Sequence, residues 1–318
     1  MASKDKVFRH AFLRFSFIFS FLFLLVFAAS AFAQQSASEE HIQKGNQLLS
    51  GGYPDQAVAE YSKAIMYNPK SDFAYLQRGI ANGMTGRLKK AMEDFNKAIE
   101  INPKVPEAFF SRGMVNERMN QPDAAVKDYS EAIELNPNYA EAFHNRGTQY
   151  HKKGLTNLAI DDFRQAIVLE PNYARAYYNL GVTYKSIGDT TLALRSYNRA
   201  VEIDPKFIDA YYNRGLLYYE QNDFAPAIKD FQRILAIDST NAHAWFNLGA
   251  TYEIDKQYGK ALDSYKKYTI YAPFPEKEKV EALKKRFPDI ENKMQGRKLP
   301  KLPDDVKLRP ADTAGMGK

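Results

Sequence analysis

The feature that most constrains the fold of this 318-residue chain is a sequence period of 34 residues. Two near-copies of one stretch are INPKVPEAFFSRG (101–113) and LNPNYAEAFHNRG (135–147). Two more follow as LEPNYARAYYNLG (169–181) and IDPKFIDAYYNRG (203–215). A fixed period of roughly 20–50 residues is typical of proteins in which each copy forms one small structural unit. No such unit can bury its apolar face alone, so we expect the copies to stack.

Three positions of the period carry the same kind of residue in seven successive copies. The first is a glycine, at Gly45, Gly79, Gly113, Gly147, Gly181, Gly215 and Gly249. Twelve residues later stands an alanine, at Ala57, Ala91, Ala125, Ala159, Ala193, Ala227 and Ala261. Four residues further on stands an aromatic residue, at Tyr61, Phe95, Tyr129, Phe163, Tyr197, Phe231 and Tyr265. Residues of ordinary abundance do not agree in this way by chance, so we predict seven repeats over residues 38–275.

Each repeat reads as two helices joined by a tight turn. The first helix has apolar residues at helical spacing and ends at a glycine or an asparagine, which supply left-handed helix caps. These turn residues are Gly52, Gly86, Asn120, Gly154, Gly188 and Asn222. The second helix stops before a proline, because proline disfavours helical backbone in the preceding residue. We expect the glycines and alanines to let the two helices touch and the aromatic rings to fill the space beside the contact.

These residues resemble the tetratricopeptide repeat family, in which small and aromatic positions recur over 34 residues. The resemblance covers residues 38–275 and implies an all-α fold, a right-handed α-solenoid of antiparallel helix pairs. Repeats six and seven depart from the pattern at Ile234, Ser239, Lys256 and Tyr268. Residues 276–297 are expected to form a capping helix region, with a polar helix over 276–287 whose inner face carries Val280, Leu283 and Phe287. Residues 298–318 are predicted to be a disordered tail.

Residues 1–33 have the order of a secretory signal peptide: a basic start, an uncharged and mostly apolar run, and small residues before Gln34. We predict cleavage between Ala33 and Gln34. The alternative is an uncleaved inner-membrane anchor, since the apolar run is just long enough to cross a bilayer. On either interpretation the rest of the chain is exported. The absence of cysteine and of N-x-S/T sequons favours a bacterial periplasm over eukaryotic secretion.

In the family that the chain resembles, the first helices line a concave groove that binds partners. That resemblance assigns the groove to particular repeat positions. The fifth position includes Phe110, His144, Tyr178, Tyr212 and Phe246, and the sixth includes Asn145, Asn179, Asn213 and Asn247. Asparagine amides both donate and accept, so this row is a candidate for binding the backbone of an extended peptide. The alternative is structural: the asparagines space neighbouring helices, and the aromatic rings pack between them.

Arginines before the repeat glycine, at Arg78, Arg112, Arg146 and Arg214, allow two interpretations. They are able to bind a partner's carboxylate, but we favour a structural role in which their side chains cover the helix and meet acidic neighbours. His144 and His151 lie seven residues apart, roughly 10 Å along a helix, which is too far for one metal ion. We therefore expect neither a metal nor a cofactor.

No motif of phosphate binding, zinc hydrolysis or serine catalysis is present, so we predict that the chain is not an enzyme. Carboxylates such as Glu93 and Asp94 are expected on solvated helix faces. The positive charge lies in the two terminal segments and the repeats are near neutral, which argues against nucleic-acid binding. The predicted function is an extracytoplasmic scaffold that binds a peptide or protein, with membrane contact only through the signal or anchor segment. Self-association and glycan binding remain the alternatives.

Overall fold

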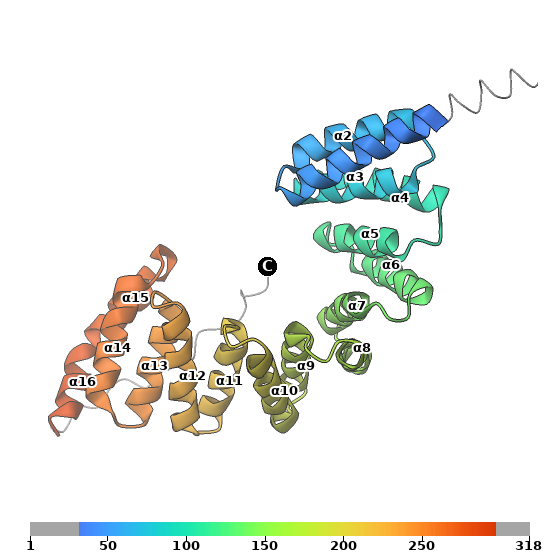
Figure 1. Cartoon of the computed structure of the whole chain (residues 1–318). Helices are drawn as coiled ribbons and strands as arrows, with labels where there is room; N and C mark the ends of the chain where they lie inside the picture. Colours follow the sequence, from blue (N-terminus) through green and yellow to red (C-terminus); the bar gives the residue numbers. More distant parts are fainter. Residues whose placement is uncertain (1–31, 297–318) are drawn as a thin grey trace, which may run out of the picture. The chain divides into compact units, whose positions relative to one another are not determined.

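The computed structural model describes residues 32–296, and all of their regular elements are helices. Of the predicted signal peptide, residues 1–31 lie outside the described part, as does the predicted tail. The first helices are residues 32–50, α3 (Asp72–Met84), α5 (Pro106–Arg118), α7 (Ala140–Lys152), α9 (Ala174–Ser186), α11 (Ile208–Glu220) and α13 (Ala242–Ile254). The second helices are α2 (Pro54–Tyr67), α4 (Leu88–Ile101), α6 (Pro122–Leu135), α8 (Thr156–Leu169), α10 (Thr190–Ile203), α12 (Phe224–Ile237) and α14 (Tyr258–Tyr271). The predicted all-α solenoid of helix pairs is confirmed (Figure 1).

The chain divides into two compact units, Met1–Gln149 and Tyr150–Lys318. Within each unit a first helix packs against the second helix of its own repeat and of the repeat before it. Between residues 32 and 296, no helix is both long enough and apolar enough to cross a membrane. The predicted cleavage site falls at the start of the described helix over residues 32–50, where Ala33 and Gln34 are exposed.

The turns between paired helices confirm the predicted caps. Gly52, Gly86, Gly154 and Gly188 have φ between 72° and 81°, and Asn120 and Asn222 have φ of 57° and 60°. In repeat seven Lys256 takes the same left-handed conformation, with φ 60°. A side chain makes this conformation costly, by about 1 kcal/mol or more. The helix stop is therefore imposed by the packing on both sides of the turn, even where the residue disfavours it.

The close contact between paired helices lies at the repeat glycines. A Cβ atom at Gly181 would stand 2.7 Å from the ring of Tyr197, and at Gly113 it would stand 2.7 Å from Tyr129. An added Cβ atom would likewise stand 2.5–2.6 Å from the aromatic ring of the same repeat at three further glycines, Gly45, Gly79 and Gly249. The seven repeat alanines, from Ala57 to Ala261, are all fully buried. The aromatic rings thus pack directly on the backbone of the first helix, and no larger residue fits there.

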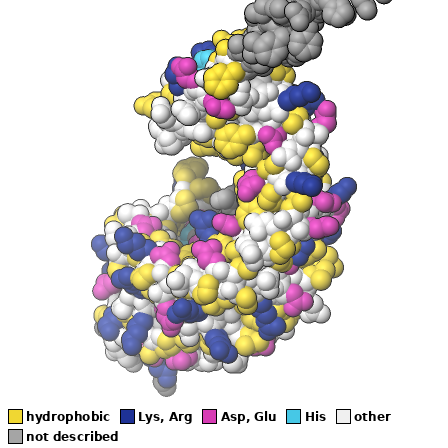
Figure 2. All heavy atoms as spheres, turned by 45° about the vertical axis from the view of Figure 1, so that its right-hand side comes forward, with side chains coloured by type: hydrophobic (Ala, Val, Ile, Leu, Met, Phe, Trp, Pro, Cys, Tyr) yellow, Lys and Arg dark blue, Asp and Glu magenta, His cyan; other side chains and the backbone are white. Residues whose placement is uncertain are grey.

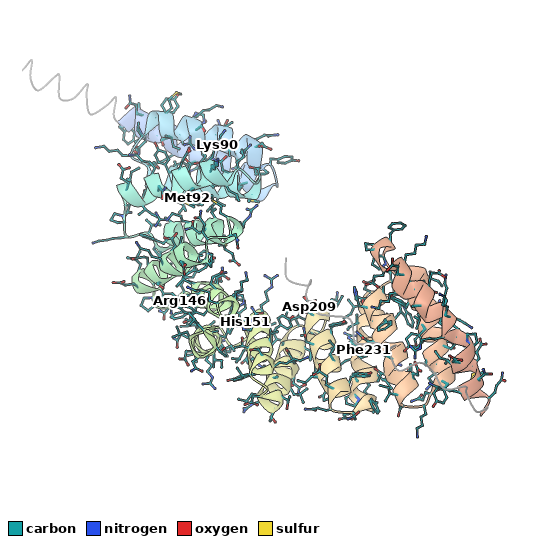
Figure 3. The ribbon with its side chains drawn as sticks, turned by 180° about the vertical axis from the view of Figure 1, so that it is seen from behind. Lys90, Met92, Arg146, His151, Asp209 and Phe231 are labelled. Atoms are coloured by element: carbon teal, nitrogen blue, oxygen red, sulfur yellow. The ribbon has the colours of Figure 1, made fainter. Side chains whose placement is uncertain are left out.

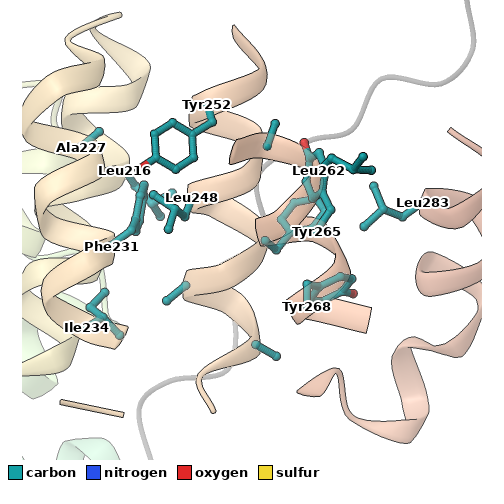
Figure 4. Packing of buried hydrophobic residues seen from close by; sticks show 14 of the residues in the cluster. Leu216, Ala227, Phe231, Ile234, Leu248, Tyr252, Leu262, Tyr265, Tyr268 and Leu283 are labelled. Atoms are coloured by element: carbon teal, nitrogen blue, oxygen red, sulfur yellow. The ribbon is translucent and has the colours of Figure 1, made fainter. Parts of the chain in front are cut away.

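Two of the departures in repeats six and seven belong to a larger core near the end of the described chain. Ile234, Tyr268 and Leu283 are fully buried in it (Figure 4). Phe246 is fully buried in the same core. Tyr268 makes an edge contact with the ring of Phe246, and its hydroxyl donates to Glu276. Tyr268 therefore joins the last repeat to the segment that follows it.

The helix expected over residues 276–287 is present, and a second helix that was not expected follows it within the predicted capping region. After the 3₁₀ turn η1 (Phe274–Glu276) come α15 (Lys277–Lys285) and α16 (Phe287–Met294). Val280 and Leu283 are buried as expected, Phe287 is half-buried, and Ile290 on α16 is buried as well. Arg286 and Lys293 both donate to Glu253 of α13, at 3.0 and 3.1 Å. The second helix results from Pro288, which fits a first helical turn but not a helix interior.

We predict opposite effects of two alanine substitutions. Gly181→Ala should lower the free energy of unfolding by about 1–3 kcal/mol, because the added methyl group overlaps the Tyr197 ring. Gly83→Ala is the matched control in α3, since no atom lies within 4 Å of the added methyl group. It should stabilise the chain by up to about 1 kcal/mol. Urea unfolding followed by circular dichroism measures both, and equal effects would contradict the role given to the glycine–ring contact.

Candidate functional site

The sixth repeat position connects neighbouring first helices. Nδ2 of Asn213 donates to the Tyr178 hydroxyl at 2.9 Å, and Nδ2 of Asn247 donates to the Tyr212 hydroxyl at 2.9 Å. The other N–H of Asn213 is 3.1 Å from the carbonyl oxygen of Asp209. Burial raises the pKa of Tyr178 to about 12, so its hydroxyl stays protonated at neutral pH. These two asparagines hold consecutive repeats together, and Asn213 has no N–H group left for a peptide.

The remaining residues of the predicted groove differ in accessibility. Asn145, Asn179, Phe110 and Tyr178 are half-buried. The residues that are buried, with their exposed fractions, are His144 (9%), Tyr212 (4%), Asn247 (3%) and Phe246 (1%). Lys279 of α15 lies 4.2 Å from the centre of the Phe246 ring and 5.5 Å from that of Tyr268. The structure thus offers only part of the predicted row to a partner, and α15 covers its end.

Exposed apolar side chains lie on this face of α3 and at one position of α5, and the sequence analysis did not single out Phe73 and Met84. Phe73, Met84 and Met114 have exposed fractions of 44%, 59% and 41%. Phe73 and Met84 lie eleven residues apart on α3, with half-buried Ile80 between them, which places all three on one side of the helix. Met114 stands on α5 at the repeat position of Ile80. The apolar residues seven and eleven positions after Phe73 are the signal in the sequence that would have revealed the α3 part of this row. We call Phe73, Ile80, Met84 and Met114 the apolar row.

The same face in the second unit is charged. Lys185 of α9 donates to Glu220 of α11 at 3.0 Å, and Arg175 at the start of α9 is exposed. Asp209 stands at the first turn of α11, and burial raises the pKa of its carboxyl group (Figure 3). In the view of Figure 2, basic and acidic side chains are interspersed and form no large patch of one sign. Exposed Glu107 and Arg118 of α5 place charge on this face in the first unit as well, so the apolar row is confined to α3 and Met114.

The arginines before the repeat glycine have the structural role that we favoured. Arg112 donates to Asp128 at 2.6 Å in its own repeat and to Asn96 at 2.8 Å in the second helix before it. Two further bridges have the same geometry, Arg78 with Asp94 and Ser62, and Arg214 with Asp230 and Asn198. Arg146 likewise donates to Ser130 of the second helix before it. We call this arrangement the arginine bridge. Its carboxylates are buried, so the expectation that Asp94 lies on a solvated face was wrong.

The two histidines contact different neighbours. His144 Nδ1 lies 3.0 Å from Oδ1 of Asn145, and His151 Nδ1 lies 3.1 Å from the Thr183 hydroxyl. That hydroxyl donates its proton to the Asn179 carbonyl at 2.7 Å, so Nδ1 of His151 is the donor toward Thr183. Burial lowers the pKa of His151. Among the described residues no group of three metal-ligating side chains is gathered.

Comparison with known families agrees with this geometry. Models described as "TPR repeat" match residues 118–154, 147–188 and 183–222. Models described as "Tetratricopeptide repeat" match residues 74–105, 208–241 and 231–263. Together these matches cover more than half of the chain, and those over residues 74–105 and 208–241 each correspond to one helix pair of the structure. The chain belongs to the tetratricopeptide repeat family.

Several solved structures are similar to this chain in fold. A tetratricopeptide repeat protein from Parabacteroides merdae is 19% identical, with a TM-score of 0.57, and the match covers 81% of this chain and 99% of that one. PilF of Pseudomonas aeruginosa is 17% identical, with a TM-score of 0.59 and coverage of 68% and 97%. PilW, described as a widely conserved type IV pilus biogenesis factor, is 21% identical, with a TM-score of 0.57 and coverage of 63% and 92%. No match was found among curated proteins.

The arginine bridge predicts a non-additive pair of substitutions. Arg112→Leu leaves the buried Asp128 carboxylate without its cation and should cost about 3 kcal/mol. Arg112→Leu combined with Asp128→Ser places at these two positions the residues that repeat five has at Leu180 and Ser196. The double variant should recover more than half of the loss. A double-mutant cycle by urea unfolding tests this, and simple addition of the single effects would contradict it.

His151 predicts a dependence of stability on pH. Its pKa in the folded chain lies below the unfolded value of about 6.5, so the unfolded chain binds the proton more tightly. Stability that is present above about pH 6.5 should therefore decrease as the pH falls below that value. His151→Gln removes this contribution and should flatten the curve. Unfolding midpoints measured from pH 7.5 to pH 5 check the slope, and parallel curves for the two chains would disprove the assignment.

Proposed function

We propose that the chain is a protein-interaction scaffold that binds a peptide segment of a partner protein on the face of its first helices. The tetratricopeptide fold presents such a face as a preformed surface, which reduces the ordering cost of binding. The observation that supports this role most directly is the apolar row of α3 and α5. Aligned exposed apolar side chains on a soluble domain are typical of a partner surface. Methionine suits such a surface because its flexible side chain adapts to different partners.

The predicted groove residues have a modified role in this proposal. Asn145 and Phe110, in the same unit as the apolar row, are accessible enough to contact the partner, whereas Asn179 belongs to the second unit. Asn213 and Asn247 act mainly by holding first helices together through Tyr178 and Tyr212. A partner segment would therefore pack its own apolar side chains against the row, with polar contacts at its edge. None of these contacts requires a catalytic group or a cofactor.

We also propose that the chain is exported, on the basis of the signal-like residues 1–33. The structure is compatible with cleavage after Ala33, because the interior contacts of the first described helix begin later. Ser38 is 1% exposed, and its hydroxyl donates to the Ala64 carbonyl at 2.9 Å. Removal of the residues before Gln34 leaves this contact in place. N-terminal sequencing of the protein from its host would find Gln34 first if the segment is cleaved and Met1 or Ala2 if it is retained as an anchor.

The binding role is tested by crosslinking in cells, affinity capture and mass spectrometry with three chains. These are the native chain, a variant with Met84→Glu and Met114→Glu, and a control with Met66→Glu. Met66 is 70% exposed on the second helix α2, so the control adds charge to the same unit but away from the apolar row. We expect one partner that the native and control chains capture and that the double variant loses by about tenfold or more.

Two outcomes would overturn this assignment. If all three chains capture the same proteins in equal amounts, the apolar row is not the binding surface. If the captured protein is the chain itself, and its sedimentation coefficient rises with concentration, self-association replaces the scaffold role. Circular dichroism of each variant verifies that the helices are intact before capture results are compared.

A further inference from the structure

Repeats five and seven have no arginine bridge. Leu180 and Ser196 replace its arginine and aspartate in repeat five, and Leu248 and Ser264 replace them in repeat seven. In these two repeats a different hydrogen bond joins the first helix to the second helix of the preceding repeat. Arg164 donates to the Tyr184 hydroxyl at 2.7 Å, and Gln232 donates to the Tyr252 hydroxyl at 2.9 Å. In both repeats the tyrosine that accepts this bond stands four residues, about one helical turn, after the leucine.

A hollow lies beside Leu180 and Ser196. In repeat five it lies between the second helices α8 and α10, with α9 as its floor, and has a volume of about 800 Å³. The corresponding hollow of repeat seven has about 340 Å³, and that of repeat two, which keeps its arginine bridge, about 290 Å³. The floor and walls of the hollow in repeat five are apolar, because Leu180, Ile167 and Leu192 line them. We call it the repeat-five hollow; its volume is in the range of small-ligand sites.

The rim of the repeat-five hollow is positively charged. Arg164, Arg195 and Arg199 line it together with a single acidic residue, Glu202. Arg199 and Glu202 are 3.1 Å apart, but both side chains are about half exposed, so their attraction is weak. Arg164 bonds to a neutral hydroxyl, which leaves its charge uncompensated. Arg195 forms no ion pair with any residue in the described part of the chain. The hollow therefore carries an excess of positive charge above an apolar floor.

We propose that the repeat-five hollow is a second binding site, which takes an acidic peptide segment of a partner protein. An aliphatic or aromatic side chain would lie on Leu180, and neighbouring carboxylates would reach Arg195 and Arg199. Guanidinium groups bind carboxylates by paired, charge-assisted hydrogen bonds. A bare phosphate would gain nothing from the apolar floor, and a nucleic acid requires a longer row of basic groups. This site lies away from the first-helix face and does not depend on the function proposed for it.

The probe for this site is a fluorescein-labelled peptide, acetyl-Leu-Asp-Asp-Phe-Asp-amide, titrated against the full chain. Its neutral partner has asparagine in place of each aspartate. We expect saturable binding of the acidic peptide only, which weakens about tenfold or more when Arg195→Gln and Arg199→Gln are combined. Both arginines are largely exposed, so this variant should fold normally.

A second pair of variants tests the hollow itself. Leu180→Arg with Ser196→Asp rebuilds the arginine bridge in repeat five and fills the hollow, and should abolish peptide binding. Leu248→Arg with Ser264→Asp makes the same two changes in repeat seven and should leave binding unchanged. Equal binding by both variants, or equal loss in both, would overturn the proposal. So would equal affinity for the neutral peptide, or displacement of the acidic peptide by millimolar inorganic phosphate, which would reveal a simple anion site.

Discussion

The contact on which the rest of this structure depends is that between a first-helix backbone and an aromatic ring of the second helix. At Gly113 and Gly181 the missing side chain lets the ring of Tyr129 or Tyr197 lie against the helix itself. This fixes the distance and the register of each helix pair. Because every pair has the same register, equivalent positions of successive repeats fall beside one another. The asparagine–tyrosine links, the arginine bridges and the apolar row all follow from that alignment.

Features that depend on one residue and its own backbone were predictable from the sequence. The left-handed turns at Gly52 and Asn120 are examples, because these residues adopt that conformation at little cost. Lys256 was not predictable in this way, since its conformation is imposed by the helices on both sides. The second helix of the capping region, α16, was also missed, although Pro288 gave a local signal. Secondary structure was thus recovered best where local preference and tertiary packing agree.

The candidate site was less predictable, because exposure depends on contacts between repeats. A sixth-position asparagine next to a groove suggests peptide binding, but Asn247 is turned to Tyr212 of the preceding repeat. That link could have been anticipated by reading position five of one repeat against position six of the next. Phe73 and Met84 were overlooked for a different reason. They lie at positions where most other repeats carry polar residues, so the averaged pattern of the family does not describe them.

The arginine bridge also changes what counts as a unit of this protein. Arg112 joins three helices, and its contact with Asn96 lies in the repeat before its own. The alternative arrangement in repeat five uses Arg164 of repeat four in the same place. A repeat cut out as the sequence counts it would leave one of these partners behind. The piece that can be exchanged between positions, by gene duplication or by design, therefore runs from the middle of one second helix to the middle of the next.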